Sequence, residues 1–398
     1  MKHYYLLALG GIGFCWTASA QQDVQKALQN QFITVQPGDT IAITAGIFEL
    51  EGTLWMDDKQ NVVIRGQGKD RTVLSFKNQR SGAEGIKITN SRNIIVEELT
   101  VLDAKGDAIK VQQTENITFR HVKTAWSGKP KKTNGAYGFY PVNCKGVTIE
   151  YSESVGASDA GIYVGQSQDI VVRYCKAWHN VAGIEIENSL YADVHDNEVF
   201  NNTGGILVFD LPDLIQKKGG FVRVFNNHIH ENNHINFAPK GNIVAKVPQG
   251  TGLLILATNN VEVFQNRIVN NISVGAGIMS YYMTEEPIKD KEYYPYPDKI
   301  HIHDNYFERP PVRATSKGRL GMMFRLKLKF GIDVPHILFD GISDAQRSEK
   351  MQICIRNNTN QTFANLDAGN DFKNVSRSLE NFDCELPSLQ PVIMKNAR

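Results

Sequence analysis

The feature that most constrains the fold of this chain is a repeat of 22 residues near its middle. Three segments begin with glycine, and in each of them the first and third residues after the glycine are apolar: 161–167, 183–189 and 205–210. Gly and Asn separate the units, and both residue types favour tight turns. Two short strands in 22 residues leave no room for a pair of helices, so the repeat indicates stacked β-strands.

The pattern extends on both sides of these segments. One large apolar residue occupies the same place in each unit: Ile86, Ile109, Phe139, Ile162, Ile184, Ile206, Leu253 and Ile278. We expect these residues to stack in a coil with one turn per unit, because neighbouring strands lie about 4.8 Å apart. Parallel crossovers are right-handed. The predicted fold class is therefore all-β, a right-handed parallel β-helix.

A second series consists of asparagines, each of which follows an alternating strand: Asn197, Asn227, Asn266 and Asn305. Aligned asparagines at a sharp turn can bond one another's amides and the backbone. We interpret the series as structural.

Both ends of such a coil need covers, because open strand edges pair with other chains. At the first end we expect Asp23 to be the N-cap of an amphipathic helix over residues 24–30, followed by a turn at Pro37-Gly38-Asp39. The repeat fades after about residue 310. The predicted organisation is a signal peptide (1–20), a cap with the first rung (21–60), the coil (61–310) and an irregular C-terminal cap (311–398).

The first twenty residues have the features of a secretory signal. Lys2 precedes a short apolar run, and small residues stand at Ala18 and Ala20. The run is too short to span a bilayer, for which about 20 residues are needed. We expect cleavage near Ala20 and a secreted or periplasmic protein with no membrane span.

The net charge and the cysteines bear on the partners of the protein and on its disulfides. The formal net charge is only +1, which argues against a nucleic-acid partner. In an oxidising compartment Cys354 and Cys384, which bracket a polar stretch, can form a disulfide. Cys144 and Cys175 are expected to be buried apolar residues. We expect a monomer.

The repeats and the opening residues 35–41 (VQPGDTI) resemble the secreted right-handed parallel β-helix proteins of the pectin-lyase-like superfamily. Residues 156–167 and 181–189 are similar to a bacterial set of parallel β-helix repeat proteins. The resemblance covers residues 23 to about 310. It implies the β-helix fold and a carbohydrate partner, since the superfamily includes polysaccharide lyases, glycoside hydrolases and uronate epimerases.

Two columns of side chains should point outward, because direction alternates along a strand. The first column reads Lys87, Lys110, Tyr140, Tyr163, Glu185, Leu207, Leu254 and Met279. The second reads Thr89, Gln112, Val142, Gly165, Glu187, Phe209, Leu256 and Tyr281. Both change from polar to apolar after the same rung. We expect the insertions 212–220 and 234–250 to cover the later rungs and to leave the earlier ones open as a groove.

Acidic sugars fit such a groove. A uronate that undergoes β-elimination needs a cation beside its carboxylate and a proton carrier at C5. The predicted catalytic residues are Lys110, Tyr140, Tyr163 and Glu185, and the predicted substrate-binding residues are Tyr137, Glu187 and Tyr281. The carboxylates of Asp159, Glu185 and Glu187 suit Ca²⁺, which prefers oxygen ligands.

The residues of the predicted groove allow other interpretations. Glu185 and Glu187 have the spacing of an acid/base pair for hydrolysis. Tyr137–Val142 (YGFYPV) resembles the Tyr-Gly-Phe-Asp-Pro-His segment of mannuronan epimerases, but Tyr140 and Val142 replace its acid and its histidine. The leading hypothesis is a protein that binds and cleaves an acidic polysaccharide. The alternative is a non-catalytic carbohydrate-binding or envelope scaffold protein, in which these side chains are an ordinary strand face.

Two further groups have two interpretations each. The pairs His228/His230 and His301/His303 can bind Zn²⁺ or Cu²⁺, but the sequence completes no ligand set, so we expect surface histidines. The tyrosines around a Pro-broken loop either stack on sugar rings or pin the loop to the coil: Tyr281, Tyr282, Tyr293, Tyr294 and Tyr296.

Overall fold

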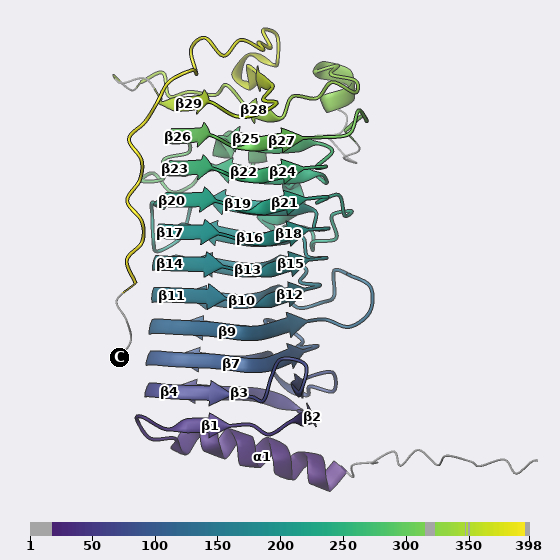
Figure 1. Cartoon of the computed structure of the whole chain (residues 1–398), viewed down its shortest axis with the longest axis vertical. Helices are drawn as coiled ribbons and strands as arrows, with labels where there is room; N and C mark the ends of the chain where they lie inside the picture. The colour runs from purple at the N-terminus through teal and green to yellow at the C-terminus, as the bar shows by residue number, and fades with distance from the viewer. Residues whose placement is uncertain (1–17, 315–322, 347, 349–350, 395–398) are drawn as a thin grey trace, which may run out of the picture.

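The computed structural model describes residues 18–314, 323–346, 348 and 351–394. They wind into one coil of stacked strands, which confirms the predicted right-handed parallel β-helix (Figure 1). Each turn contributes to three faces. A 19-stranded sheet forms the first and second faces, and an 11-stranded sheet forms the third.

The first face consists of β1 (Thr40–Ala42), β4 (Gln60–Arg65), β7 (Arg92–Leu102), β9 (Glu115–Ala125), β11 (Lys145–Glu150), β14 (Gln168–Arg173), β17 (Leu190–His195), β20 (Gly220–Phe225), β23 (Asn259–Phe264), β26 (Asp298–His303) and β29 (Ile353–Arg356). The second consists of β2 (Gly46–Glu49), β5 (Thr72–Ser75), β12 (Glu153–Val155), β15 (Lys176–Trp178), β18 (Glu198–Phe200), β21 (His228–His230), β24 (Arg267–Val269) and β27 (Tyr306–Glu308). The long strands β7 and β9 belong to both.

The third face consists of β3 (Gly52–Asp57), β6 (Ser81–Thr89), β8 (Ile109–Gln112), β10 (Tyr137–Val142), β13 (Ala160–Gly165), β16 (Ala182–Glu187), β19 (Gly204–Phe209), β22 (Thr251–Leu256), β25 (Val274–Met279), β28 (Ile337–Phe339) and β30 (Phe363–Asn365). The helices are α1 (Ala18–Thr34), the 3₁₀ turns η1 (Ile243–Lys246), η2 (Tyr281–Thr284) and η4 (Ala368–Asn370), and the π-helical η3 (Met323–Lys327).

The predicted apolar column fills the coil. The following residues are fully buried and in register from rung to rung: Ile86, Ile109, Phe139, Ile162, Ile184, Ile206 and Leu253. The last predicted member is wrong, because Leu253 pairs with Ala276 and Ile278 continues the next inward position. Gly275 is the equivalent of the earlier glycines, since a Cβ there would lie 2.6 Å from the His336 carbonyl. On β25 the two outward columns therefore contain Gly277 and Met279.

The asparagine series is structural, as predicted. Each side-chain amide donates to the next along Asn197, Asn227, Asn266, Asn305 and Asn358, at 2.9 Å in every step. A second ladder that the sequence analysis missed joins Asn180, Asn202, Asn232 and Asn271 at 2.9–3.1 Å. These buried amides satisfy one another and nearby carbonyls, which fixes the stacking of the turns.

Helix α1 covers the first end of the coil (Figure 1). Phe32 is fully buried against the core, and Gln29 bonds both the N–H and the C=O of Trp55 on the end strand β3, each at 2.9 Å. The helix therefore satisfies an edge that would otherwise be open. Asp23 is not its N-cap. It lies inside α1, because the alanines and glutamines before it favour helix. Most of the predicted signal peptide, residues 1–17, lies outside the described residues.

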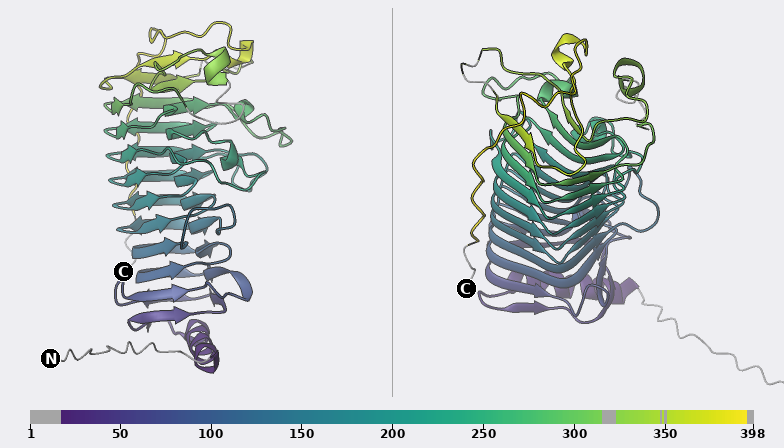
Figure 2. Two further views of the ribbon diagram at one scale, coloured as in Figure 1. Left: turned by 90° about the vertical axis from the view of Figure 1, so that its right-hand side faces the viewer. Right: turned by 45° about the horizontal axis from the view of Figure 1, so that its top comes forward.

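The coil continues beyond residue 310, through β28, β29 and β30, and the Cys354–Cys384 disulfide joins β29 to the segment that follows β30. After Cys384 the chain runs back along the first face as an extended tail (Figures 1 and 2). Cys144 and Cys175 are buried free thiols, as predicted. Among the described residues no helix is long and apolar enough to cross a membrane.

Candidate functional site

The two insertions fold back over the third face, toward its earlier rungs. The backbone N–H of Ile215 donates to Oε1 of Gln166 at 3.0 Å, and Asn242 Nδ2 donates to Asp159 Oδ2 at 2.8 Å. As predicted, the later outward residues are buried beneath them: Leu207, Phe209, Leu254 and Leu256. The expectation of an open earlier groove is wrong for Tyr163, Glu185 and Glu187, which the same cover buries.

Three tyrosines meet where the cover ends. The ring centroids of Tyr137 lie 4.5 Å from Tyr140 and 4.6 Å from Tyr163, and the last two are 5.0 Å apart. Lys110 lies on the next strand toward the N-terminal end, with Nζ 4.8 Å above the Tyr140 ring. Tyr137, Tyr140 and Lys110 are half-buried, so they form the accessible part of this cluster.

A group of carboxyls lies behind the tyrosines. The Tyr163 hydroxyl donates to Glu187 Oε1 at 2.7 Å, and the Tyr137 hydroxyl bonds Asp159. Glu185 lies between Tyr163 and Leu207 in the rung order and is 1% exposed. Its Oε2 has no hydrogen-bond partner among the described residues.

Burial sets the protonation of this group. It raises the pKa of Asp159 to about 7 and that of Glu187 to about 7, and it raises the pKa of Glu185 well above its usual value. Neighbouring carboxyls act in the same direction on Asp159 and Glu185, because like charges disfavour ionisation. The cluster therefore holds protons near neutral pH.

The three tyrosines bind their protons more firmly than the carboxyls do. Burial raises the pKa of Tyr140 to about 12 and the pKa values of Tyr137 and Tyr163 well above 10. Nearby carboxyls add to the effect, since a phenolate beside them would be repelled. These phenols are hydrogen-bond donors near neutral pH, and the site's readily exchanged protons are on Asp159 and Glu187.

Tyr281 does not present an exposed ring face. Its side chain is 6% exposed and packs edge-on against Tyr293, with the centroids 5.3 Å apart. The Tyr293 hydroxyl in turn donates to the Asp210 carbonyl at 2.6 Å. Of the two interpretations of this loop, the structure favours tyrosines that pin it to the coil.

The predicted Ca²⁺ ligands lie in one buried neighbourhood, but they do not form a compact set. In the part of the chain that the structure describes, two groups have at least three ligand atoms within 4.8 Å of one another, and neither contains Asp159, Glu185 or Glu187. Each of these groups contains a histidine pair and one glutamate. Ca²⁺ binding at the carboxyls stays a prediction.

Sequence reasoning missed two acids of the cluster and the residue that covers it. Burial raises the pKa of Asp107 to about 6 and that of Asp210 to about 8. Asp107-Ala108 and Asp159-Ala160 share the same dipeptide before a strand of the third face, which is a usable signal. Nothing in the sequence pairs Asn242 with Asp159, because that contact depends on how the insertion folds.

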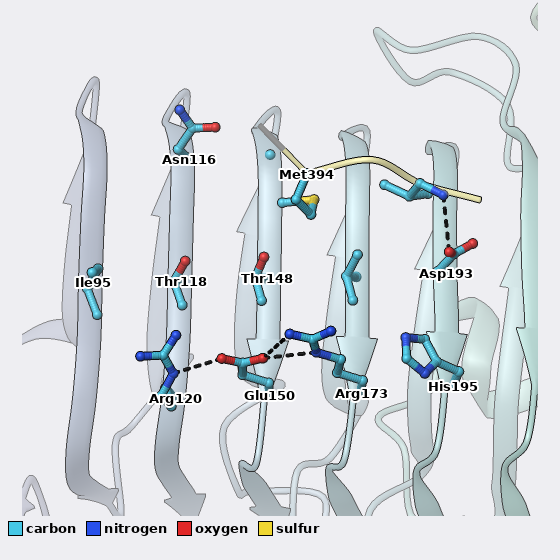
Figure 3. A pocket seen from close by; sticks show the side chains of 13 residues that line it. Ile95, Asn116, Thr118, Arg120, Thr148, Glu150, Arg173, Asp193, His195 and Met394 are labelled. Carbon is cyan, nitrogen blue, oxygen red and sulfur yellow. Dashed lines mark hydrogen bonds and ion pairs between the residues drawn. The ribbon is translucent and has the colours of Figure 1, made fainter. Parts of the chain in front are cut away.

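A groove of about 480 Å³ on the first face was also missed. Figure 3 shows its floor, where Glu150 accepts hydrogen bonds from Arg120 Nε and Arg173 Nη2, each at 2.7 Å, and Met394 of the tail lies over it. Burial alone would raise the pKa of Glu150, but the two guanidinium groups outweigh it and lower the pKa. Because these arginines bind Glu150, they stabilise the face, and we place the candidate site at the tyrosines instead.

Comparison with known proteins identifies the fold. A sequence-family description, the right handed beta helix region, matches residues 60–215. No curated protein sequence matches the chain.

The chain is also similar to several solved structures. The A-module of the mannuronan C-5 epimerase AlgE4 from Azotobacter vinelandii aligns with a TM-score of 0.52 at 15% identity, over 85% of this chain and 91% of that one. The DFA-IIIase of Arthrobacter chlorophenolicus A6 gives 0.45 at 12% identity, over 83% and 92%. A hyperthermoactive exopolygalacturonase from Thermotoga maritima gives 0.47 at 14% identity, over 74% and 84%. At these identities the likeness concerns the fold alone, and the chain is a right-handed parallel β-helix protein.

Proposed function

We propose that this protein binds an acidic polysaccharide across Tyr137, Tyr140 and Lys110 and transfers protons to it from the carboxyls behind them. The observation that carries the proposal is the contact of half-buried Tyr137 with Asp159, whose pKa is raised to about 7. Tyrosine faces bind the apolar faces of sugar rings. An acid whose pKa lies near the working pH is suited to proton transfer.

Lysines near this surface favour an acidic ligand. Lys87 and Lys110 are neighbours on β6 and β8. Exposed lysines also occupy the turns that lead into β8 and β10: Lys105, Lys129, Lys131 and Lys132. These turns stack closely, since a Cβ on Gly135 would lie 1.6 Å from the Gly106 carbonyl oxygen. The stacking brings their charges to one edge of the third face.

Hydrolysis fits the site better than β-elimination. β-Elimination by a tyrosine base needs an ionised phenol, and the raised pKa values of Tyr140 and Tyr163 oppose one. Hydrolysis needs a protonated acid near the glycosidic oxygen, which Asp159 or Glu187 can supply. The proposed reaction therefore begins with proton donation from one of these carboxyls to the glycosidic oxygen.

Non-catalytic binding is the second candidate function. Its supporting observation is the cover over Glu185, which leaves that carboxyl 1% exposed. In that case the tyrosines and Lys110 bind the polymer, and the carboxyls only stabilise the cluster.

We also propose that the protein is exported, with cleavage near Ala20. The Cys354–Cys384 disulfide supports this, because disulfides persist in oxidising compartments. The mass of the mature protein, isolated from the producing cell's periplasm or medium, tests the proposal.

The test uses the mature protein with alginate, pectate and glycosaminoglycans, each with Ca²⁺ and with EDTA. New reducing ends without unsaturated ends indicate hydrolysis, and ultraviolet absorbance of unsaturated ends indicates β-elimination. Retardation in polymer-containing gels measures binding. We expect Lys110→Ala to weaken binding about tenfold, since a hydrogen bond to a charged group contributes about 1.5 kcal/mol.

Two variants separate the candidate functions. Asp159→Asn removes the proton donor that contacts Tyr137 and should strongly reduce the yield of new reducing ends while binding persists. Tyr174→Phe is the control, because Tyr174 is an exposed tyrosine next to a strand of the first face. Binding with no new ends on any polymer supports the non-catalytic function, and absence of binding to every polymer contradicts both.

A further inference from the structure

Both histidine pairs face a glutamate that the sequence alone did not reveal. Each pair occupies one strand at positions i and i+2, and the neighbouring rung places a glutamate beside the first histidine. The two groups are Glu198 with His228 and His230, and Glu262 with His301 and His303. In each group the ligand atoms lie within 4.8 Å of one another. An acid follows each second histidine, at Glu231 and Asp304.

The Glu262 group has the spacing of metal ligands. His303 Nε2 lies 3.2 Å from Glu262 Oε1. Zinc bonds to nitrogen and oxygen are about 2.0–2.1 Å long, so two ligands on a tetrahedral ion are about 3.3 Å apart. An ion can therefore replace the direct contact with little movement of either side chain.

Neighbouring groups orient both ligands. His303 Nδ1 lies 2.7 Å from Asp304 Oδ2, which leaves Nε2 directed at the site. Its ring stacks on Phe264 with the centroids 5.4 Å apart and the planes within 3°. The other carboxylate oxygen of Glu262, Oε2, accepts the backbone N–H of Leu389 at 2.9 Å. Carboxylate partners of this kind fix the orientation of histidine ligands in metal sites.

His301 supplies an independent observation. It is 6% exposed, so the expectation of a surface histidine is wrong here, and neither ring nitrogen has a hydrogen-bond partner among the described residues. A buried imidazole without partners is costly. It lies on β26 beside Glu262 of β23, with its ring centroid 4.0 Å from that of His303.

We propose that Glu262, His301 and His303 bind one Zn²⁺ ion, with water as the fourth ligand. Two imidazoles and a carboxylate are a zinc-type set, whereas Ca²⁺ and Mg²⁺ prefer oxygen ligands throughout. The Glu198 group is the weaker candidate, because all three of its residues are half-exposed and Lys176 Nζ binds Glu198 at 2.8 Å.

The ion joins the C-terminal tail to the coil. Through Glu262 it stabilises the contact with Leu389, and on the other side of His301 the rung order places Cys354, whose disulfide tethers the start of the tail. Further along, Val392 donates its backbone N–H to Asp193 Oδ2 at 3.1 Å. The tail is therefore held at three places, one of them at the zinc site.

The experiment measures zinc on the full mature chain with its disulfide intact. After treatment with EDTA and dialysis against Zn²⁺, elemental analysis should give one ion per chain, and calorimetry its affinity. We expect Glu262→Gln to weaken binding at least about 100-fold. Asp304→Asn, which keeps all three ligands, should weaken it about 10- to 100-fold. Co²⁺ substitution should give the visible spectrum of a four-coordinate site.

His195→Gln is the matched control. His195 lies on the same outward column, bonds Asp196 at 2.6 Å and stacks on Phe225 at 4.7 Å, but its neighbour at i−2 is Asp193 instead of histidine. This variant should keep full affinity. Loss of the ion in His228→Gln but not in Glu262→Gln overturns the assignment, as does failure of the wild-type chain to bind Zn²⁺ at micromolar concentration.

Discussion

Asn242 donates a hydrogen bond of 2.8 Å from Nδ2 to Oδ2 of Asp159, which lies 83 residues earlier in the chain. The bond joins the insertion before β22 to the turn before β13. It also opposes the effect of burial, which raises the pKa of Asp159 to about 7. The insertion therefore both covers the carboxyl cluster and limits its loss of acidity.

Asn242→Ala should raise the pKa of Asp159 further, because the bond that favours its ionised form is lost. It should also lower the free energy of unfolding by about 1–3 kcal/mol, the cost of a buried polar group without its partner. Carbon-13 NMR titration of the aspartate carboxyls and urea unfolding measure the two effects. Lys240→Ala, an exposed change in the same insertion, is the control, and equal titration curves in both variants would contradict the prediction.

Stability should fall as pH rises from about 6.5 to 8.5. Burial raises the folded-state pKa of Asp159 and Glu187 to about 7 and of Asp210 to about 8, so the folded protein binds protons that the unfolded chain has lost. Each carboxyl contributes its full stabilisation below the pKa that it has in the unfolded chain. The stabilisation is lost as the pH rises through the pKa that the carboxyl has in the folded protein. This pH range lies above the one in which His301 affects stability, because burial lowers the pKa of that histidine to about 4.

Urea unfolding across that range tests the sign. Each carboxyl contributes a slope of up to about 1.4 kcal/mol per pH unit. Glu187→Gln should make the dependence shallower, whereas Asp169→Asn, outside the cluster, should leave it unchanged. A free energy of unfolding that does not fall between pH 6.5 and 8.5 would show that the cluster is already ionised in the folded protein.

Asn266→Ala should destabilise the coil by about 3–5 kcal/mol. The buried Asn266 side chain donates to the Val224 carbonyl at 2.8 Å and to Asn305 Oδ1 at 2.9 Å, and its Oδ1 accepts the N–H of Asn227 at 3.0 Å. Each group left without a partner costs about 1–3 kcal/mol. Chemical denaturation measures the loss, and the exposed change Asn78→Ala should cost less than about 1 kcal/mol.

Cys384→Ser should release the tail and lower stability by about 3–4 kcal/mol, as expected for a disulfide that closes a loop of this size. The bond spans a sequence separation of 30 residues. Hydrogen exchange at the amides of Leu389 and Val392 should accelerate, because their contacts with the first face lose their tether. Cys144→Ala, which changes a buried free thiol, should leave exchange in the tail unaltered.

Most of the fold was predictable, because a repeat makes each rung evidence for the next. The glycine before Ile162, Ile184 and Ile206 fixes the register of three turns, and the structure confirms it. The predicted register is wrong at β25, where Gly275 and Gly277 allow two alignments that keep the same inward face. Only the close approach of the His336 carbonyl selects Gly275.

The site was predictable in part. Tyr137, Tyr140, Tyr163 and Lys110 lie together because strand register alone sets their spacing. The predicted exposure of Tyr163, Glu185 and Glu187 was wrong. The direction in which an insertion folds depends on contacts that follow no repeat, such as that of Ile215 with Gln166, 49 residues apart.

By itself the sequence determined the coil, its inward column and the columns of side chains on its faces. These follow from hydrogen bonding between neighbouring strands and from the alternation of side chains, both of which are local and repeated. The tertiary structure alone decided which carboxyls are covered and that Glu262 lies beside two histidines. It also decided where the tail lies. Those contacts join segments that are separated by insertions of irregular length. There the distance between two groups is set by packing and desolvation, because no repeat relates them.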